Sequence, residues 1–145
     1  MVPFVGRSEY LCTLLDDPRL LGITVSLVGE DFNYLTSDGS YYVGNTGWHS
    51  DGWRSEFRHL NLAFYLDELT RDTGCLRVIP GSHRPGDAFA DALQDQAGRC
   101  EGTWGIDGHE VPSMPLEVHP GDLVCFNKNL KHSSWGAAAA VACSR

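Results

Sequence analysis

The sequence predicts an all-β core of the sandwich or jelly-roll type, with short flanking helices. Short β-rich segments alternate with Gly- and Pro-containing turns along most of the chain, which is typical of this fold class. A content of 42% hydrophobic and 21% charged residues indicates a globular chain. We find no internal repeat and no boundary between domains, so residues 1–145 are interpreted as a single domain.

The N-terminal part is expected to contain a helix, a strand and a hairpin. Residues 8–17 place leucines at helical spacing, which predicts a short helix. Residues 23–28 alternate apolar and polar side chains and are rich in β-branched residues, which predicts a half-buried strand. Residues 33–43 are rich in aromatic side chains around an Asp38-Gly39 turn signal, and we expect a hairpin there.

The middle of the chain is expected to contain two strands separated by a loop. Residues 60–66 are apolar on both faces, which predicts a central strand. Residues 67–74 are polar and predict a loop, and residues 75–79 predict a short strand. The Pro-Gly pair within residues 80–83 predicts a turn that ends this strand.

The C-terminal half is expected to contain a helix, a crossover and a second hairpin. Residues 87–96 have apolar side chains at helical spacing, and residues 98–108 predict an irregular lid or crossover. Segments 116–118 and 122–126 flank His119-Pro120-Gly121, where Pro and Gly occupy the positions that a type II turn favours. We therefore expect these two segments to pair as a hairpin.

A candidate metal-binding motif lies at Trp48-His49-Ser50-Asp51. Side chains two positions apart project from the same face of a strand, so His49 and Asp51 would point the same way. His132, expected at the start of a later strand, is the candidate third ligand. Two histidines and one carboxylate form a facial triad that leaves positions of an octahedral Fe(II) open for substrate and oxygen. Alone, a His-x-Asp pair is more often solvated or hydrogen-bonded.

The composition excludes several classes of partner and site. With 11 Lys+Arg against 19 Asp+Glu, the net charge of −8 argues against a nucleic-acid or anionic-membrane partner. No apolar run approaches the roughly 20 residues of a transmembrane helix, and no signal peptide is visible. Five cysteines without a CxxC arrangement favour reduced thiols and a cytoplasmic location. We expect a small-molecule substrate and leave the oligomeric state open.

Several sequence blocks occur in a characteristic order and spacing. They are Trp48-His49-Ser50-Asp51, Gly74-Cys75-Leu76-Arg77-Val78-Ile79-Pro80-Gly81-Ser82-His83, Pro120-Gly121-Asp122 and His132-Ser133-Ser134. Together these blocks resemble the phytanoyl-CoA dioxygenase family. The resemblance covers about residues 20–136 and is more specific than any single block.

The resemblance implies a double-stranded β-helix, the cupin-like form of the jelly roll. It also implies a mononuclear Fe(II) enzyme that uses 2-oxoglutarate and O2 to hydroxylate a small-molecule or acyl substrate, with decarboxylation of 2-oxoglutarate to succinate. Carried over by position, His49, Asp51 and His132 would be the iron ligands. Related halogenating enzymes replace the carboxylate by a small residue, so Asp51 favours hydroxylation.

The 2-oxoglutarate site matches the family only in part. Ser134 occupies a position that commonly hydrogen-bonds the cosubstrate. The family also has an Arg about ten residues beyond the distal His, whose planar fork binds the far carboxylate. Here the only later Arg is Arg145, after an alanine run that is poor strand material. We therefore expect residues 137–145 to be a non-native tail, as a frame shift would produce, and the chain to be a fragment incomplete at its C-terminus.

Other residues carry weaker predictions. Trp53 is a candidate wall of the substrate pocket. Arg77 is interpreted as part of a structural ion pair, with a substitute carboxylate anchor as the alternative. His59 has no partner pattern and is interpreted as structural or exposed. Substrate selection is expected around residues 53–59 and 99–109.

Two other functional classes remain open at this point. One is a catalytically inactive metal-binding or ligand-binding β-sandwich derived from such an enzyme, which the missing Arg supports. Oxygen-dependent turnover of 2-oxoglutarate would exclude it. The other is a zinc hydrolase that uses the same three ligands and a bound water. Activity without oxygen would support that class.

Overall fold

The computed structural model describes residues 5–40, 43–53 and 56–137. Backbone contacts divide the chain into an N-terminal unit, residues 1–42, and a larger unit, residues 43–145. Each unit is described by itself. None of the helices within the described residues is long and apolar enough to cross a membrane.

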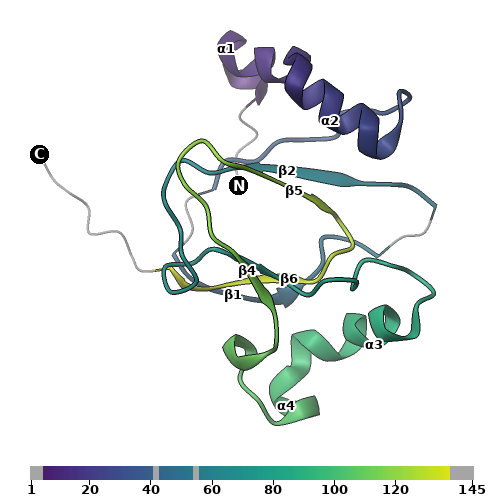
Figure 1. Ribbon diagram of the computed structural model, residues 1–145, viewed down its shortest axis with the longest axis vertical. Coiled ribbons are helices and arrows are strands. Elements are labelled where there is room, and N and C mark those ends of the chain that lie inside the picture. The colour runs from purple at the N-terminus through teal and green to yellow at the C-terminus, as the bar shows by residue number, and fades with distance from the viewer. Residues whose placement is uncertain (1–4, 41–42, 54–55, 138–145) are drawn as a thin grey trace, which may run out of the picture. The chain divides into compact units, whose positions relative to one another are not determined.

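The N-terminal unit is helical (Figure 1). It contains the 3-10 helices η1 (Val5–Arg7) and η2 (Thr13–Asp16) and the α-helices α1 (Glu9–Cys12) and α2 (Pro18–Val28). The helix predicted over residues 8–17 is therefore confirmed as α1 followed by η2.

The strand predicted for residues 23–28 is wrong, because this segment is the second half of α2. The Asp17 side chain caps the helix by accepting a hydrogen bond from the backbone of the first turn, and Pro18 occupies the first helical position. The hydroxyls of Thr24 and Ser26 donate to carbonyls one turn earlier, at 2.8 and 2.7 Å. These local bonds satisfy the polar side chains within the helix, while the Asp17 cap and Pro18 favour a helix over the weak strand preference of the β-branched residues.

The hairpin predicted for residues 33–43 is also wrong where the structure describes it. Residues 33–40 form no strand, and residues 41 and 42 lie outside the described part of the chain. Instead, the hydroxyl of Ser37 accepts a hydrogen bond from the backbone N–H of Val5 at 3.1 Å. Within the described residues, this segment contacts η1 of its own unit and has a single β-bridge position at Gly39.

The larger unit contains two antiparallel sheets that face each other (Figure 1). One sheet has the strand order β1-β6-β3-β4, and the other consists of β2 and β5. The strands are β1 (Gly44–His49), β2 (Leu60–Phe64), β3 (Leu76–Val78), β4 (Met114–Leu116), β5 (Leu123–Asn127) and β6 (His132–Ala137). The β-rich, antiparallel architecture with short helices agrees with the predicted fold class.

The predictions for the middle of the chain are largely confirmed. The strand at 60–66, the loop at 67–74, the strand at 75–79 and the turn at 80–83 are all present, with small shifts of their ends. The central position expected for the first strand is wrong, because β2 pairs only with β5 among the described strands.

Helices cover the face of the four-stranded sheet that points away from the two-stranded sheet (Figure 1). They are α3 (Ala88–Gln96), η3 (Ala97–Arg99), α4 (Cys100–Trp104) and η4 (Gly108–Glu110). The predicted helix over residues 87–96 is confirmed, with Asp87 as its cap. The irregular conformation expected for the lid or crossover over residues 98–108 is wrong, because most of this segment is helical and Cys100 is buried in the hydrophobic core.

Trp48 connects β1 to this helical layer. Its side chain is 5% exposed and packs with Ile79, Leu93 and Ala97 in the core. Its indole N–H donates to the Gly108 carbonyl at 2.7 Å. Since side chains alternate along a strand, the neighbouring His49 points to the opposite face of the sheet, toward the other sheet.

The hairpin predicted across the Pro-Gly turn is wrong, although the turn itself is confirmed. Asp122 N donates to the His119 carbonyl at 3.0 Å, and Gly121 has φ +94°, as a type II turn requires. However, β4 pairs with β3, whereas β5 pairs with β2. The chain therefore crosses from one sheet to the other at this turn.

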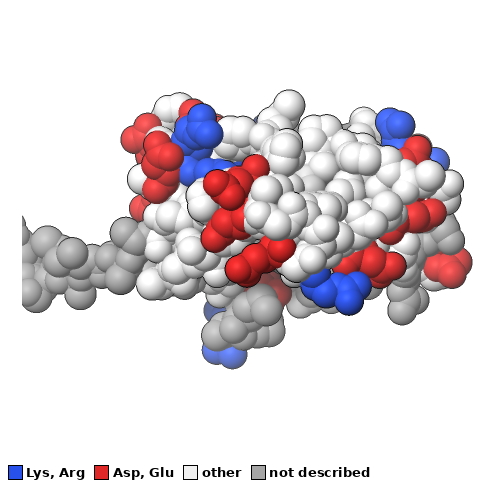
Figure 2. Space-filling model, turned by 90° about the horizontal axis from the view of Figure 1, so that it is seen from below, with Lys and Arg blue, Asp and Glu red and all other residues white. Residues whose placement is uncertain are grey.

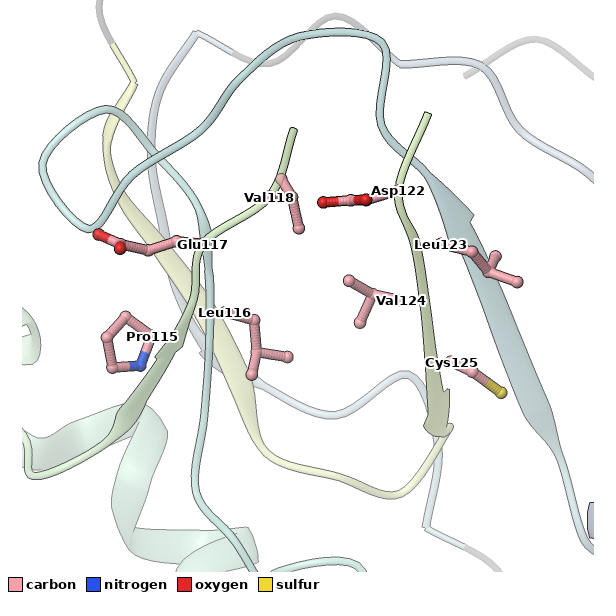
Figure 3. A pocket seen from close by; sticks show the side chains of 8 residues that line it. All are labelled: Pro115, Leu116, Glu117, Val118, Asp122, Leu123, Val124 and Cys125. Atoms are coloured by element: carbon pink, nitrogen blue, oxygen red, sulfur yellow. The ribbon is translucent and has the colours of Figure 1, made fainter. Parts of the chain in front are cut away.

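A cavity of about 520 Å³ separates β4 from β5. Figure 3 shows Leu116 and Val124 pointing into the space between the two strands, whereas Leu123 and Cys125 point away from it. The alternation along β5 thus assigns one face of that strand to the space between the sheets and the other face to the outside.

We expect Gly136→Ala to lower the free energy of unfolding by about 2–3 kcal/mol. Gly136 has φ +84°, and a Cβ there would lie 2.5 Å from the backbone carbonyl oxygen of Asp72. Neither the positive φ nor the backbone contact can be relieved by a side-chain movement. Urea denaturation would measure the change. Gly22→Ala is the control, because Gly22 lies within α2 with no atom within 4 Å of an added Cβ. A loss no larger than that of the control would contradict the prediction.

Candidate metal centre

The structure brings His49, Asp51 and His132 together in the space between the two sheets. One ligand atom from each of the three side chains lies within 4.8 Å of the others. Asp51 Oδ1 lies 3.7 Å from Nε2 of His49 and 3.8 Å from Nε2 of His132. Two metal–ligand bonds of about 2.1 Å each can span up to about 4.2 Å, so the separations of Asp51 Oδ1 from the two imidazoles fit a shared metal ion.

The sheet register and one loop bond position the three side chains. His49 is the last residue of β1 and pairs with His132, the first residue of β6. The expectation that His49 and Asp51 share one strand is therefore wrong, since Asp51 lies in a bend two residues beyond the strand end. Its backbone N–H donates to the Lys128 carbonyl at 3.1 Å, which holds the bend beside the end of β5.

Backbone hydrogen bonds determine which nitrogen of each histidine faces the site. Nδ1 of His49 lies 2.8 Å from the Gly47 carbonyl, and Nδ1 of His132 lies 2.8 Å from the Leu130 carbonyl. A carbonyl oxygen only accepts, so each Nδ1 must carry the proton. In the neutral rings, both Nε2 lone pairs therefore point toward Asp51, as metal ligands require.

His132 is the most buried member of the set. Its side chain is 8% exposed, compared with 42% for His49 and 35% for Asp51. Burial lowers the pKa of His132, and the nearby His49 lowers it further. The lowered pKa favours the neutral imidazole, which is the form that binds a metal.

Asn61 orients the carboxylate of Asp51. Its side-chain amide donates to Asp51 Oδ2 at 2.6 Å, which leaves Oδ1 facing the two imidazoles. Sequence reasoning missed this residue. The available signal was a lone amide in the otherwise apolar segment Leu60-Asn61-Leu62-Ala63-Phe64, because a polar side chain within such a strand usually has a specific partner.

Asn61→Leu is expected to weaken Fe(II) binding about tenfold, since groups that orient metal ligands are typically worth 10–100-fold in affinity. Leucine has a similar volume but no donor, so Asp51 would be free to turn away. An anaerobic Fe(II) titration would measure the affinity. A thermal melt of the same metal-free sample would show whether the fold is intact. An intact variant with wild-type affinity would argue against the orienting role.

Three further residues were predicted from the sequence to belong to the site, and the structure describes two of them, Ser134 and Trp53. The Ser134 hydroxyl donates to the Gly74 carbonyl at 2.8 Å. Trp53 is partly buried but does not line the cavity beside Asp51. Arg145 lies outside the described residues.

The interpretation of Arg77 as part of an ion pair is wrong for the described part of the chain. Its guanidinium donates to the carbonyls of His109 and Arg71, both at 3.0 Å. Its Nε is buried without a hydrogen-bond partner. Arg77 therefore links β3 to the preceding loop and to η4, which leaves it structural rather than a carboxylate anchor.

A second cavity, of about 440 Å³, opens directly beside the candidate ligands. It is lined by Asp51, Gly52, Phe57, His59, Lys128 and Asn129. His59 was interpreted from the sequence as structural or exposed. In the structure it lines the same cavity as Asp51. Of the segment expected to select the substrate, Phe57 and His59 line this cavity, whereas Cys100 in the second expected segment is buried in the hydrophobic core.

Acidic and basic side chains are unequally represented on the face of the molecule drawn in Figure 2. Figure 2 shows one face of the molecule, on which acidic side chains prevail. The Lys and Arg side chains on this face form separate groups with acidic side chains between them. This face therefore has no basic stripe of the kind that binds a nucleic-acid backbone.

Comparisons with known proteins find similar sequences. A sequence model described as "Phytanoyl-CoA dioxygenase (PhyH)" matches residues 33–138. The chain is 29% identical to the ectoine dioxygenase of Sphingopyxis alaskensis over 159 aligned residues, which cover 90% of this chain and 50% of the relative. It is 38% identical to phytanoyl-CoA dioxygenase 1 of Oryza sativa subsp. japonica over 79 residues, covering 48% of this chain and 25% of the relative.

The fold is similar to solved structures. A crystal structure of EctD from S. alaskensis with 2-oxoglutarate and 5-hydroxyectoine matches with a TM-score of 0.67 and 24% identity, over 95% of this chain and 51% of that chain. The similarity at this identity concerns the fold. The chain spans about half the length of the ectoine dioxygenase that it matches.

Proposed function

The chain belongs to the phytanoyl-CoA dioxygenase family, and on that premise we propose that it is an Fe(II)- and 2-oxoglutarate-dependent dioxygenase that hydroxylates a small molecule. The proposed iron ligands are His49, Asp51 and His132. The proposed architecture is a double-stranded β-helix, supported by the two antiparallel sheets that face each other with the candidate ligands between them.

The observation that carries the proposal is the convergence of three electron-pair donors. Nδ1 of each histidine is committed to a backbone carbonyl, so in the neutral rings the Nε2 lone pairs of His49 and His132 face Oδ1 of Asp51. Three such atoms repel one another unless a cation lies among them. Two imidazoles and one carboxylate are the ligand set of non-haem Fe(II) oxygenases.

When bound at this site, Fe(II) would activate O2 at the expense of 2-oxoglutarate, which is decarboxylated to succinate as the substrate is hydroxylated. The protein side chains would do the holding and orienting. His132 would supply a buried, neutral imidazole, and Asp51 would supply the negative charge. Asn61 would keep Asp51 Oδ1 directed at the ion.

An anaerobic titration tests the proposal. Fe(II)-loaded protein would be titrated with 2-oxoglutarate, and the visible charge-transfer band of the chelated keto acid would be recorded. We expect the band in the wild-type chain and not in His132→Ala. Iron binding without a band would favour the inactive metal-binding β-sandwich. Zn(II)-dependent hydrolysis without oxygen would favour the hydrolase instead. Either result would overturn the proposed function.

A further inference from the structure

We propose that the cavity beside the candidate metal centre binds the carboxylate of a small organic acid, and that Lys128 is the residue that binds it. The inference rests on the proposed function, because it describes a ligand held next to the metal. It goes further by naming the chemistry of that ligand and the side chain that selects it.

The first support is the face of the two-stranded sheet that points to the triad. Asn61 of β2 pairs with Phe126 of β5. Asn61 donates to Asp51, and the ring of Phe126 lies 5.2 Å from that of His132 between centroids. This pair of positions therefore faces the candidate ligands.

The sheet register also determines which later residues point to the same side as Asn61 and Phe126. The next pair, Leu60 and Asn127, belongs to the opposite face, because side chains alternate along both strands. One step further, Lys128 N donates to the His59 carbonyl at 3.1 Å and continues the ladder. Lys128 and His59 thus return to the side of the triad, and both line the cavity beside Asp51.

The second support is the room that the chain leaves for the lysine. A Cβ added to Gly52 would lie 3.3 Å from Cε of Lys128. Because Gly52 has no side chain, the apolar stem of Lys128 can lie against the backbone next to Asp51. Among the described residues, no carboxylate forms an ion pair with this ammonium group. Its charge is therefore available to a ligand.

The third support is the contrast with the rest of the protein. The net charge of −8 repels anions in general. The chain has two lysines, and the other, Lys131, is buried with 5% exposure. Lys128 is the one Lys or Arg side chain among the described residues that line the cavity beside Asp51.

The composition of the cavity favours a carboxylate over a phosphate. A phosphate group carries about −1.5 to −2 charges near pH 7, which one ammonium group beside the carboxylate of Asp51 would not balance. A carboxylate carries a single charge that Lys128 can match. Phe57, which is 65% exposed, offers an apolar wall for the carbon skeleton. The cavity of about 440 Å³ suits a small molecule.

Two sources of this carboxylate are possible, and the experiment has one arm for each. The first arm measures the affinity of the Fe(II)-loaded protein for 2-oxoglutarate and for 2-oxopentanoate, which lacks the second carboxylate. The second arm measures binding of phenylacetate and of its neutral analogue phenylacetamide by NMR shifts of the metal-free protein. Each arm compares wild type with Lys128→Met, Lys128→Arg and Arg84→Met. Arg84 is exposed and does not line the cavity, so its replacement controls for net charge.

We expect wild type to prefer the carboxylate-bearing ligand about fivefold in at least one arm, as for a partly exposed ion pair. Lys128→Met should lose the preference, whereas Lys128→Arg and Arg84→Met should keep it. A preference in the first arm assigns the carboxylate to the cosubstrate, and one in the second arm assigns it to the substrate. No preference in either arm, or one that survives in Lys128→Met, would overturn the inference.

The two proposals fail separately. If iron binds and Lys128→Met changes neither arm, the inference fails while the metal centre stands. If iron does not bind but phenylacetate binding depends on Lys128, the proposed function fails and the carboxylate site stands.

Discussion

Asp51→Ala is expected to weaken Fe(II) binding by at least about 100-fold, more than the loss of a group that only orients a ligand. Asp51 Oδ1 lies 3.7 and 3.8 Å from the two Nε2 atoms that face it. It is the only negative charge among the three proposed ligands. Without it, two neutral imidazoles would hold the ion alone. Anaerobic Fe(II) titration would measure the affinity directly.

Two further variants make this result interpretable. Asp51→Asn keeps the shape and one oxygen donor but removes the charge, so its affinity should lie between those of wild type and Asp51→Ala. Asp67→Ala removes an exposed carboxylate outside the cavity and should bind Fe(II) as the wild type does. If Asp51→Ala retained wild-type affinity, the proposed ligand set would be refuted.

Trp48→Ala is expected to lower the free energy of unfolding by about 3–5 kcal/mol, the usual cost of removing a large buried aromatic side chain. Trp48 is 5% exposed and packs against the helical layer through Ile79 and Leu93. It also precedes His49, so the same residue that anchors β1 in the core holds a proposed metal ligand in place. Because domains are stable by only about 5–15 kcal/mol, urea denaturation should show a large shift of the midpoint.

Two control variants separate packing from hydrogen bonding. Trp48→Phe keeps most of the buried surface but leaves the Gly108 carbonyl without its 2.7 Å donor, so a loss of about 1–2 kcal/mol is expected. Tyr10→Ala removes an aromatic side chain that is 79% exposed and should change stability by less than about 0.5 kcal/mol. Equal losses for Trp48→Ala and Tyr10→Ala would contradict the assigned role of Trp48.

Capping residues and apolar spacing within a few positions explain why α3 was predicted correctly, and they also explain why residues 23–28 form a helix. The helix α3 follows from apolar spacing and the Asp87 cap, both of which lie within a few residues. In residues 23–28 the β-branched residues suggested a strand, yet the Asp17 cap and Pro18 were equally visible in the sequence. The capping bond of Asp17 and the helix-compatible backbone of Pro18 outweighed a weak preference for strand.

The type II turn at His119-Pro120-Gly121 marks the limit of such local reasoning. Its residues determine the backbone conformation of the turn, but not which strands its two arms pair with. Pairing depends on β2 and β3, which lie far away in the sequence. This turn therefore connects one sheet to the other instead of closing a hairpin.

The family and the three candidate ligands could be identified from the amino-acid sequence, because the chemistry of His49, Asp51 and His132 does not depend on where they lie in the fold. The contact of Asn61 with Asp51 and the position of Lys128 beside the cavity, in contrast, are visible only in the folded chain. These placements depend on the register between β2 and β5, where a shift of one residue would turn both side chains to the other face. Register is set by contacts between distant segments, and no local pattern in the chain specifies it.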